Sequence, residues 1–384
     1  MPIGLRNIFL TLAAFVYYPI RGNARKQVSG KNFLVINQTE NIGDMVCTTP
    51  VFHAIKQKEP DARVVVLGVE KNRIMMEGNK DIDTYIVIRK SVWSDIRQIR
   101  RLKIDVGIII NPGTVDFALL FLGGVKTISC PDLSGKYKEI QSRTYSLLAM
   151  LGYRLPYVPG KYVPRQYIGL LRPFNLESED IRKHLAYTSE ADTKVKESLQ
   201  SCGIPPEQKL VAIAPGAGTK IKQWPSDRFG EVANYLSKKY GVGIVIIGGP
   251  RDIPEIEIMK RALDVNVQYC NFADQTLDEL KATLSKVVLI IGNDSGSVYI
   301  AESFGAGTMV LVGPTDEAEH PLQDRTHRVV IAKNRGSALL KSHVNSEDCI
   351  DTELARKQIE SITIEQVLSE IDDIFREMQI EVVS

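Results

Sequence analysis

The chain has 384 residues, of which 44% are hydrophobic and 24% are charged, a composition that is typical of folded proteins and excludes bulk disorder. The formal net charge is only +2, so no strong positive field favours nucleic acid as a partner. Because a single core rarely grows past about 250 to 300 residues, the length predicts two domains.

The first 30 residues form a segment of their own. Residues 8–18 are apolar and aromatic, Pro19 is expected to end this helix, and a basic cluster follows it, comprising Arg21, Arg25, Lys26 and Lys31. About 20 apolar residues are needed to span a bilayer, so this stretch is too short. We expect an interfacial helix whose basic cluster lies on anionic lipid. A signal peptide and a helix packed on the protein itself are the alternatives.

From residue 31 the pattern alternates between strands and helices. Continuous Val and Ile runs predict strands of a parallel sheet that is buried on both faces, at 33–36, 63–67, 85–88 and 106–110. Helices are expected after the first strand, through residue 58, and at 92–102. This part predicts a first Rossmann-like domain over residues 31–200, whose proline-rich end, from residue 129, would carry acceptor-side loops and the connection.

A second Rossmann-like domain is expected over residues 201–384. Strands are predicted at 211–214 and 244–247, and a helix capped by Ser226 or Asp227 at 226–240. Thr363 and Gln366 form a capping box that starts a last, C-terminal helix with one apolar stripe. Two similar sheets in tandem imply a cleft between the domains.

One β-α-β unit, residues 287–316, marks where a ligand would bind. Its two strands end at Asn293-Asp294-Ser295-Gly296 and at Gly313-Pro314-Thr315-Asp316. In open α/β sheets the carboxyl ends of the strands form the ligand-binding edge, and helix N-termini favour phosphate. The unit therefore indicates a nucleotide site. Ordinary turn and capping chemistry would give the same pattern.

A glycine-rich loop follows the strand at 211–214. It contains Gly216, Gly218 and Thr219, and Lys220 and Lys222 stand just before Trp224-Pro225. The loop lacks the third glycine of a dinucleotide fingerprint and the Gly-Lys-Ser/Thr of a Walker A loop. Backbone amides, a hydroxyl and an ammonium suit a diphosphate. A solvated lysine pair before a helix is the simpler interpretation.

The acidic residues, histidines and cysteines could in principle support other chemistry. Asp44, after the first strand, could be a general base for a sugar hydroxyl or a helix N-cap. Asp81-Ile82-Asp83 is expected to be solvated surface rather than a metal site. The five histidines lack ligand spacing. The five scattered cysteines favour buried thiols in a reducing compartment over a disulfide or a zinc site: they are Cys47, Cys130, Cys202, Cys270 and Cys349.

With three motifs in the right order, the chain resembles glycosyltransferase family 9, the ADP-heptose:lipopolysaccharide heptosyltransferase family. The motifs, which extend over most of residues 31–330, are Asn41-Ile42-Gly43-Asp44, Ala214-Pro215-Gly216-Ala217 through Lys222-Gln223-Trp224-Pro225, and Asn293-Asp294-Ser295-Gly296 with Gly313-Pro314-Thr315-Asp316. After Gly296 the family usually has a histidine three residues on, where this chain has Tyr299, and Ser297 replaces a common proline. We therefore expect some donor sugar contacts to differ.

The resemblance implies a GT-B fold, with two Rossmann-like domains facing a central cleft and the donor nucleotide on the second. It implies Asp44 as the catalytic base and Lys222 at the donor phosphates. Among the acidic residues Asp252, Glu255 and Glu257, Glu255 is the one favoured for the ribose. The predicted donor-binding set is Gly216, Thr219, Lys222, Glu255, Asn293, Asp294, Ser295, Gly296 and Thr315; acceptor-binding residues are not predicted.

The predicted function is an inverting transfer, needing neither metal nor cofactor, of heptose from ADP-heptose to lipopolysaccharide or a related glycan. The predicted partners are the nucleotide-sugar donor, a glycolipid or glycan acceptor and the inner membrane surface. The predicted location is cytoplasmic, at the inner face of the inner membrane. A sugar-nucleotide epimerase and a non-catalytic nucleotide- or carbohydrate-binding protein at the membrane are the alternatives.

Overall fold

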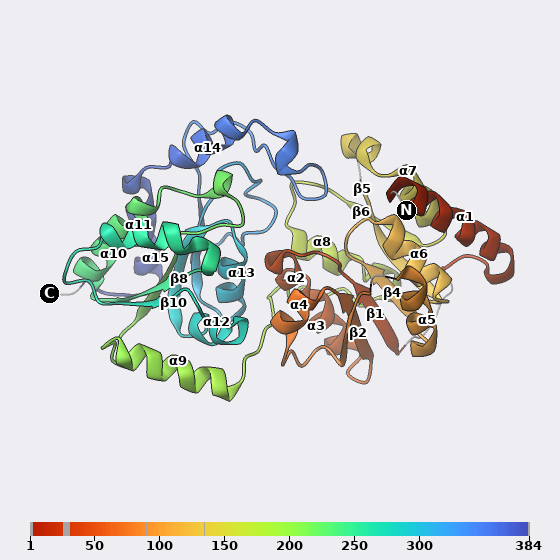
Figure 1. The fold of residues 1–384 in the computed structure, drawn as a ribbon, viewed down its shortest axis with the longest axis horizontal. Helices are drawn as coiled ribbons and strands as arrows, with labels where there is room; N and C mark the ends of the chain where they lie inside the picture. Colours follow the sequence, from red (N-terminus) through yellow and green to blue (C-terminus); the bar gives the residue numbers. More distant parts are fainter. Residues whose placement is uncertain (1–2, 26–30, 90, 134, 383–384) are drawn as a thin grey trace. The chain divides into compact units, whose positions relative to one another are not determined.

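The computed structural model describes residues 3–25, 31–89, 91–133 and 135–382. The chain divides into two compact units, Met1–Arg182 and Lys183–Ser384. Each unit contains a parallel sheet layered with helices (Figure 1). The predicted residues 26–30, including Lys26, lie outside the described ranges.

The first unit contains a six-stranded sheet in the order β3-β2-β1-β4-β5-β6, and every pair is parallel. Its strands are β1 Asn32–Ile36, β2 Arg63–Gly68, β3 Thr84–Val87, β4 Val106–Ile109, β5 Thr127–Leu133 and β6 Tyr153–Tyr157. Its helices are α1 Ile3–Arg21, α2 Ile42–Val46, α3 Thr49–Lys58, α4 Glu70–Met76, α5 Val92–Leu102, α6 Thr114–Leu122, η1 Gly135–Ile140, α7 Arg143–Ala149, α8 Val163–Gly169 and η2 Arg172–Phe174.

The second unit contains a six-stranded parallel sheet in the order β12-β11-β10-β7-β8-β9. Its strands are β7 Leu210–Ala214, β8 Gly243–Ile247, β9 Tyr269–Phe272, β10 Val287–Asn293, β11 Gly307–Leu311 and β12 His327–Val330. Its helices are α9 Ser189–Ser201, η3 Lys220–Lys222, α10 Ser226–Tyr240, η4 Pro250–Asp252, α11 Ile253–Arg261, α12 Leu277–Leu284, α13 Gly296–Ser303, η5 Glu347–Cys349, α14 Thr352–Glu360 and α15 Ile364–Glu377.

The two sheets share one topology. Within each unit the first strand in sequence pairs with both the second and the fourth, β1 with β2 and β4, and β7 with β8 and β10. Between the first and fourth strands the chain order reverses, which is the switch point where α/β sheets bind ligands. Each unit therefore has its own switch point at the carboxyl ends of its strands.

The C-terminal helix confirms the capping box and the apolar stripe. The Gln366 amide donates to Thr363 Oγ1 at 3.3 Å, and the Thr363 amide donates to Gln366 Oε1 at 3.1 Å. Ile371, Ile374 and Phe375 are fully buried in the core of the second unit. Burial of such a stripe is what holds an amphipathic helix in place, at roughly 1.5 to 3 kcal/mol per large side chain.

Three local predictions about helices were wrong. Pro19 does not end the first helix, since α1 continues to Arg21 and stops at Gly22, whose φ of +77° suits glycine. The expected single helix through residue 58 is two, α2 and α3. The cap position of α10 is Pro225, and no side chain caps that helix, so neither Ser226 nor Asp227 serves as its cap.

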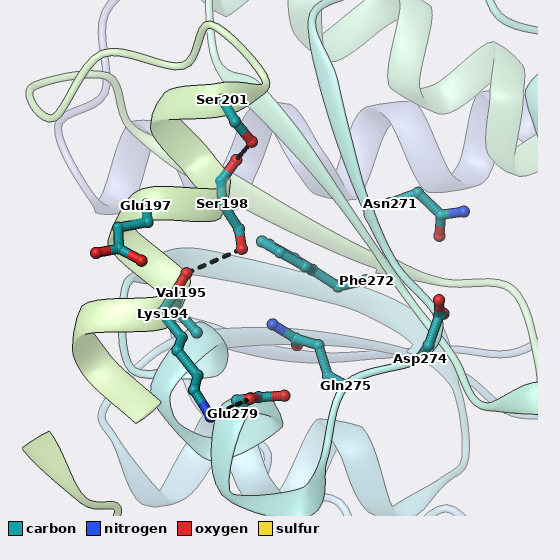
Figure 2. A pocket seen from close by; sticks show the side chains of 10 residues that line it. All are labelled: Lys194, Val195, Glu197, Ser198, Ser201, Asn271, Phe272, Asp274, Gln275 and Glu279. Atoms are coloured by element: carbon teal, nitrogen blue, oxygen red, sulfur yellow. Dashed lines mark hydrogen bonds and ion pairs between the residues drawn. The ribbon is translucent and has the colours of Figure 1, made fainter. Parts of the chain in front are cut away.

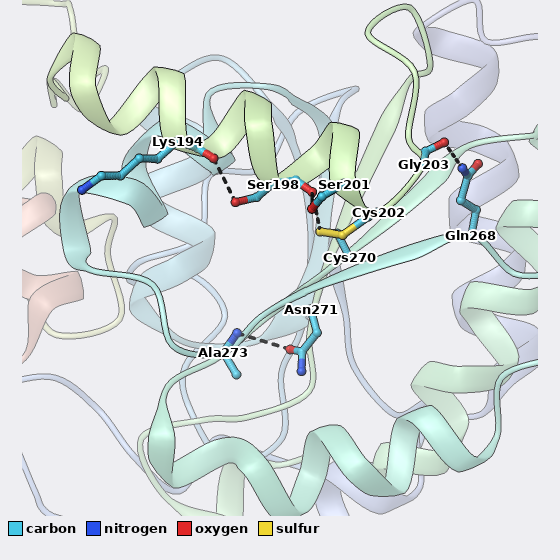
Figure 3. Close-up of a disulfide and its surroundings, with 9 residues drawn as sticks. All are labelled: Lys194, Ser198, Ser201, Cys202, Gly203, Gln268, Cys270, Asn271 and Ala273. Carbon is cyan, nitrogen blue, oxygen red and sulfur yellow. Dashed lines mark hydrogen bonds between the residues drawn. A yellow bond between two sulfur atoms is a disulfide. The ribbon is translucent and has the colours of Figure 1, made fainter.

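The cysteine prediction was also wrong. Cys202, at the end of α9, and Cys270, in β9, form a disulfide with Cα atoms 5.6 Å apart (Figure 3). The two residues are 68 positions apart in sequence. Spacing along the chain could not reveal this pair, because the fold places the end of α9 against an edge strand. Cys47 and Cys130 are buried thiols, and Cys349 is exposed.

Candidate functional site

The predicted donor motifs gather at one edge of the second sheet. Strands β8, β7, β10 and β11 are neighbours in that order, and all are parallel. The loops at their carboxyl ends therefore lie side by side. They contain Gly249, Gly216, Asp294 and Thr315. Among the predicted site residues, only Asp44 lies in the first unit; all the others lie in the second.

Asn293 joins the loops of the switch point. It is fully buried at the end of β10; its Nδ2 donates to the carbonyl oxygens of Pro215 at 2.9 Å and Gly216 at 3.1 Å, and its Oδ1 accepts from the Trp224 amide at 2.9 Å. These bonds use both ends of the side-chain amide. Asn293 therefore positions the glycine loop rather than presenting its own polar atoms to a ligand.

Trp224 anchors the segment that carries Lys222. Its ring is fully buried, its Nε1 donates to the Ile362 carbonyl oxygen at 2.9 Å, and its edge meets the ring of Phe229 with centroids 5.0 Å apart. The preceding η3 turn is half-exposed at Lys222 and exposed at Lys220. Within the described residues neither lysine has an ion-pair partner, so the ammonium groups are available to an anion.

Position 216 requires a glycine because the side chain of Asp252 packs closely against it. A Cβ atom on Gly216 would lie 2.1 Å from Asp252 Oδ1. The other carboxylate oxygen, Oδ2, accepts from the Gly249 amide at 2.8 Å. Burial raises the pKa of Asp252. Asp252 therefore links the loops after β7 and β8, and this structural task distinguishes it from the neighbouring acidic residues.

Glu255 and Thr315, both predicted to bind the donor, hold buried polar atoms without a partner. Glu255 is only 8% exposed, and its Oε2 accepts no hydrogen bond among the described residues. Thr315 Oγ1 is also buried and has no hydrogen-bond partner among the described residues. Glu257, in contrast, is paired with Lys260 at 2.8 Å on the surface. Because an unsatisfied buried polar atom costs about 1 to 3 kcal/mol, both atoms suit partners supplied by a ligand.

A buried cluster of Tyr299, Lys183 and Glu302 contacts the Asp294-Ser295-Gly296 loop through Asp294. Tyr299 is 4% exposed and donates its hydroxyl to Asp294 Oδ1. The fully buried ammonium of Lys183 lies 5.4 Å from the centroid of the Tyr299 ring and 2.5 Å from Glu302 Oε1. Tyr299 thus orients Asp294, which is how the chain uses the position where the family usually has histidine.

The N-terminus of α13 carries no side-chain cap. Ser295 is in the cap position, but its hydroxyl lies 3.0 Å from that of Ser297 instead of bonding the helix amides. The first amides of a helix have no partner within the helix and carry partial positive charge. Ser295 and Gly296 therefore border a group of amides suited to a phosphate.

Thr219 has a different environment from the one expected. Its hydroxyl donates to Glu347 Oε1 at 2.8 Å, which attaches the glycine loop to η5. The sequence offered no signal for this contact, because 128 residues separate the pair. Thr219 as a direct ligand to phosphate stays a prediction, and it would require this hydrogen bond to open or to be shared.

In the first unit, Asp44 lies in the first turn of α2 and is not the N-cap, which is Asn41. Its Oδ2 accepts from Thr39 Oγ1 at 3.0 Å and from Asn41 Nδ2 at 3.1 Å. The Thr39 amide donates to Asn37 Oδ1, and the Thr39 carbonyl oxygen accepts from Asn72 Nδ2. These hydrogen bonds hold the carboxylate in a fixed position, which a general base requires.

Asp116 is a candidate that the sequence interpretation missed. It lies in the first turn of α6, just after β4, and accepts from Gln38 in the loop that leads to Asp44. Burial raises the pKa of Asp116 to about 7. An acid that titrates near neutrality at a switch point is a functional candidate. Its position one turn after a strand end was the only available signal.

The residues 81–83 are not simply solvated surface. Asp81 Oδ2 lies 3.0 Å from His53 Nδ1, and Asp83 Oδ2 accepts from the Val64 amide at 2.7 Å and pairs with Lys56 at 2.8 Å. Val64 and Lys56 belong to β2 and α3. These acids fasten the loop before β3. Asp83 is exposed, as expected, whereas Asp81 is half-buried. Contrary to the expectation from sequence spacing, Asp81 lies with His53 and His184 in a group whose possible ligand atoms are all within 4.8 Å of one another.

A separate pocket of about 520 Å³ lies where α9 faces the loop after β9 and the start of α12 (Figure 2). Lys194 Nζ pairs with Glu279 Oε1 at 3.6 Å. Figure 2 shows this pair at one end of the pocket. None of the predicted site residues lines this pocket. The disulfide lies next to it, because Ser198 and Ser201 of α9 border both (Figures 2 and 3).

Two Rossmann-type sheets, with glycine-rich and acidic loops collected at the second switch point, define an α/β protein of the nucleotide-binding class. The model of glycosyltransferase family 9 (heptosyltransferase) matches residues 141–350, more than half of the chain. The chain belongs to this family and is a glycosyltransferase.

Among curated relatives, lipopolysaccharide heptosyltransferase 3 of Escherichia coli K12 is 25% identical over 289 residues, which are 71% of this chain and 80% of the relative. The crystal structure of a family 9 glycosyl transferase from Veillonella parvula has a TM-score of 0.75 at 21% identity, covering 92% of this chain and 99% of that one. E. coli ADP-heptose LPS heptosyltransferase II has a TM-score of 0.68 at 17% identity, covering 91% and 99%. The predicted GT-B class, with paired Rossmann sheets and C-terminal helices, is confirmed.

Proposed function

We propose that the chain transfers heptose from ADP-heptose to lipopolysaccharide or a related glycan, with inversion at the anomeric carbon and without a metal. Family membership supports glycosyl transfer, and the heptosyltransferase names of its relatives support the sugar and the acceptor. The observation that carries the donor half is the pair of unsatisfied buried atoms, Glu255 Oε2 and Thr315 Oγ1, at the edge that collects the donor motifs.

In this proposal the second unit holds the donor. Glu255 accepts hydrogen bonds from the ribose hydroxyls, which satisfies its buried oxygen. The α13 amides beside Ser295 and Gly296 and the Lys222 ammonium hold the diphosphate. Asp294, oriented by Tyr299, contacts the sugar. Asn293 and Gly216 act indirectly, because they fix the shape of the glycine loop and bring it close to the ligand.

Asp44 is the proposed general base. The acceptor hydroxyl attacks the anomeric carbon from the side opposite the nucleotide, its proton passes to the Asp44 carboxylate, and the bond between that carbon and the diphosphate oxygen breaks. ADP leaves with the bonding electron pair, so negative charge grows on the diphosphate. Lys222 and the helix amides stabilise that charge most in the transition state, and this difference is what accelerates the reaction.

The proposed location is the cytoplasmic face of the inner membrane, where a soluble nucleotide sugar and a lipid-linked acceptor can meet. Among the residues that the structure describes, no helix is both long and apolar enough to cross a membrane.

The test is a transfer assay with ADP-heptose and heptose-deficient lipopolysaccharide, with products read by mass. The wild type should add one heptose per acceptor, and Asp44→Asn should lower turnover by about 10² to 10⁴-fold, the usual contribution of a general base. Calorimetry should show unchanged ADP binding by that variant. Asp61→Asn, an exposed acid in the same unit, is the matched control. Full activity of Asp44→Asn, or conversion of the donor without acceptor, would contradict the proposal.

A further inference from the structure

The α1 helix is apolar on two opposite faces. Leu10 and Ala14 are buried in the core of the first unit, and the helix packs along α6 and α7 (Figure 1). The opposite face is exposed and carries apolar residues at helical spacing; its members are Leu5, Ile8, Phe9, Leu12, Phe15, Val16, Pro19 and Ile20. A helix that is apolar all round is stable only where both faces are covered. The protein itself covers one.

Two arginines of the expected basic cluster contact their own unit, although Arg25 and Lys31 are exposed. The Arg21 guanidinium lies 4.0 Å from the Phe121 ring centroid and donates to the Val125 carbonyl oxygen. Arg25 donates from Nε to the Gly152 carbonyl oxygen at 2.8 Å and from Nη2 to that of Met150. These arginines fasten the segment to its own unit. The contact of the basic cluster with lipid stays a prediction.

Further positive charge is supplied by α5, whose Trp93 and Arg100 contact aromatic side chains of α1. Phe9 meets Trp93 with ring centroids 6.2 Å apart, and the Arg100 guanidinium lies 5.7 Å from the Tyr17 ring. The two contacts are seven residues apart on α5 and eight residues apart on α1. Arg97 lies between Trp93 and Arg100 on the same stripe of α5.

Next to this contact is a small basic pocket of about 300 Å³. It is lined by Arg89, Ser94, Arg97, Gln98 and Arg101. Within the described residues no carboxylate pairs with these arginines. The only acid of α5, Asp95, is buried and accepts from the Arg89 amide at 3.3 Å. The exposed side of α5 is therefore purely positive, and α1 contains no acidic residue.

We propose that the exposed face of α1 and the arginine pocket of α5 form one docking surface for an anionic phospholipid bilayer. The apolar face would enter the acyl boundary, Trp93 and Tyr18 would lie at headgroup depth, and Arg97 and Arg101 would bind lipid phosphate. The adjoining positive charge favours a bilayer over a second copy of the chain, whose identical surface would bring arginines against arginines. The heptosyl transfer proposed above supplies a reason for a membrane, but the surface is inferred without it.

Tryptophan fluorescence of the wild-type protein measures vesicle binding directly. The chain has two tryptophans, of which Trp224 is fully buried and Trp93 is 48% exposed. Vesicles of phosphatidylcholine and phosphatidylglycerol at 3:1 should shift the tryptophan emission to the blue and protect it from acrylamide. Trp93→Phe should abolish the shift. An unchanged emission spectrum at saturating vesicles would overturn the proposal.

Flotation with the same vesicles tests the two halves of the surface separately. Leu12→Glu/Val16→Glu should lower the apparent affinity at least tenfold, because two large exposed apolar side chains can no longer enter the bilayer. Val265→Glu, at a 98% exposed position in the second unit, should have no effect. Arg97→Ala/Arg101→Ala should lower the affinity for the 3:1 vesicles about fivefold per arginine and leave binding to pure phosphatidylcholine unchanged. Arg325→Ala/Arg376→Ala, which removes two arginines of the second unit, is the control for this variant.

Undiminished flotation of the glutamate variant would overturn the proposal. So would light scattering that shows a wild-type dimer which the same variant dissociates, because the face would then be an interface between copies. Transfer to a water-soluble acceptor fragment should be unchanged in all these variants. A protein that binds vesicles but transfers no sugar would refute the proposed function and leave this surface intact.

Discussion

The two units use the same switch point in different ways. In each, an asparagine at the carboxyl end of the fourth strand connects to the loop of the first: Asn111 donates to Asn37 Oδ1 at 3.0 Å, and Asn293 clamps the glycine loop after β7. In the first unit this connection supports a loop of acids and their hydrogen-bond donors. In the second unit it supports a glycine loop and free cationic groups.

The difference shows how one topology separates two chemical tasks. Asp44 and Asp116 receive hydrogen bonds from Thr39, Asn41 and Gln38, so the carboxyl groups of the first unit are held in place. The second unit presents Lys222, free amides and unsatisfied acceptors, which suit an anionic ligand with hydroxyl groups. Four experiments test this difference between the two units.

The largest change is expected in the pH dependence of stability. The pKa of Asp116 is raised from 3.8 in the unfolded chain to about 7 by burial. The folded state therefore binds the proton more tightly, so stability falls as pH rises from about 4 to about 7 and levels off above. Asp116→Asn should remove this fall, worth at most about 4 kcal/mol at 1.36 kcal/mol per pKa unit. Urea unfolding at pH 4.5, 6 and 8 measures it; parallel curves for wild type and variant would contradict the assignment, and Asp61→Asn is the control.

The two asparagine connections should differ in strength. Asn293→Ala leaves three buried backbone groups without partners, at Pro215, Gly216 and Trp224, and should cost about 3 kcal/mol of unfolding free energy. Asn111→Ala removes the side-chain hydrogen bond to Asn37 and should cost about 1 kcal/mol. Thermal and urea unfolding compare them. Equal losses of unfolding free energy would show that the two asparagines stabilise the protein equally.

Lys222 and Lys220 provide a matched pair in one turn. If Lys222 holds the leaving diphosphate, Lys222→Ala should lower kcat/KM for the donor by about 10² to 10³-fold, as removal of a preorganised charge contact does. Lys220→Ala, at the exposed position, should change it less than threefold. Steady-state kinetics with varied ADP-heptose would measure both. Equal effects would indicate a general field of the two lysines rather than a specific contact.

Glu255 and Glu257 are a second matched pair, on α11. Glu255→Gln should raise the donor KM about tenfold with little change in kcat, since a ribose contact is made equally in the ground and transition states. Glu257→Gln, at the surface ion pair with Lys260, should leave both constants unchanged. A normal KM for Glu255→Gln would remove the ribose assignment and leave Glu255 as a structural residue.

Sequence patterns determined the architecture and the list of candidate residues. Runs of Val and Ile identify parallel strands, and α5, α10 and α15 follow from helical periodicity, because these signals are local and repeated. The motif loops after β7, β10 and β11 also follow, since in parallel sheets the carboxyl ends share one edge. The family resemblance rests on the same short motifs.

Only the tertiary structure decided what each polar side chain contacts. Thr219 with Glu347, Tyr299 with Asp294, and Cys202 with Cys270 are partners that no spacing announces. The same holds for Arg21 and Arg25, whose contacts with backbone carbonyl groups and an aromatic ring the sequence did not predict. Residue type limits the bonds a group can make, but distance and burial, which depend on long-range packing, select among them.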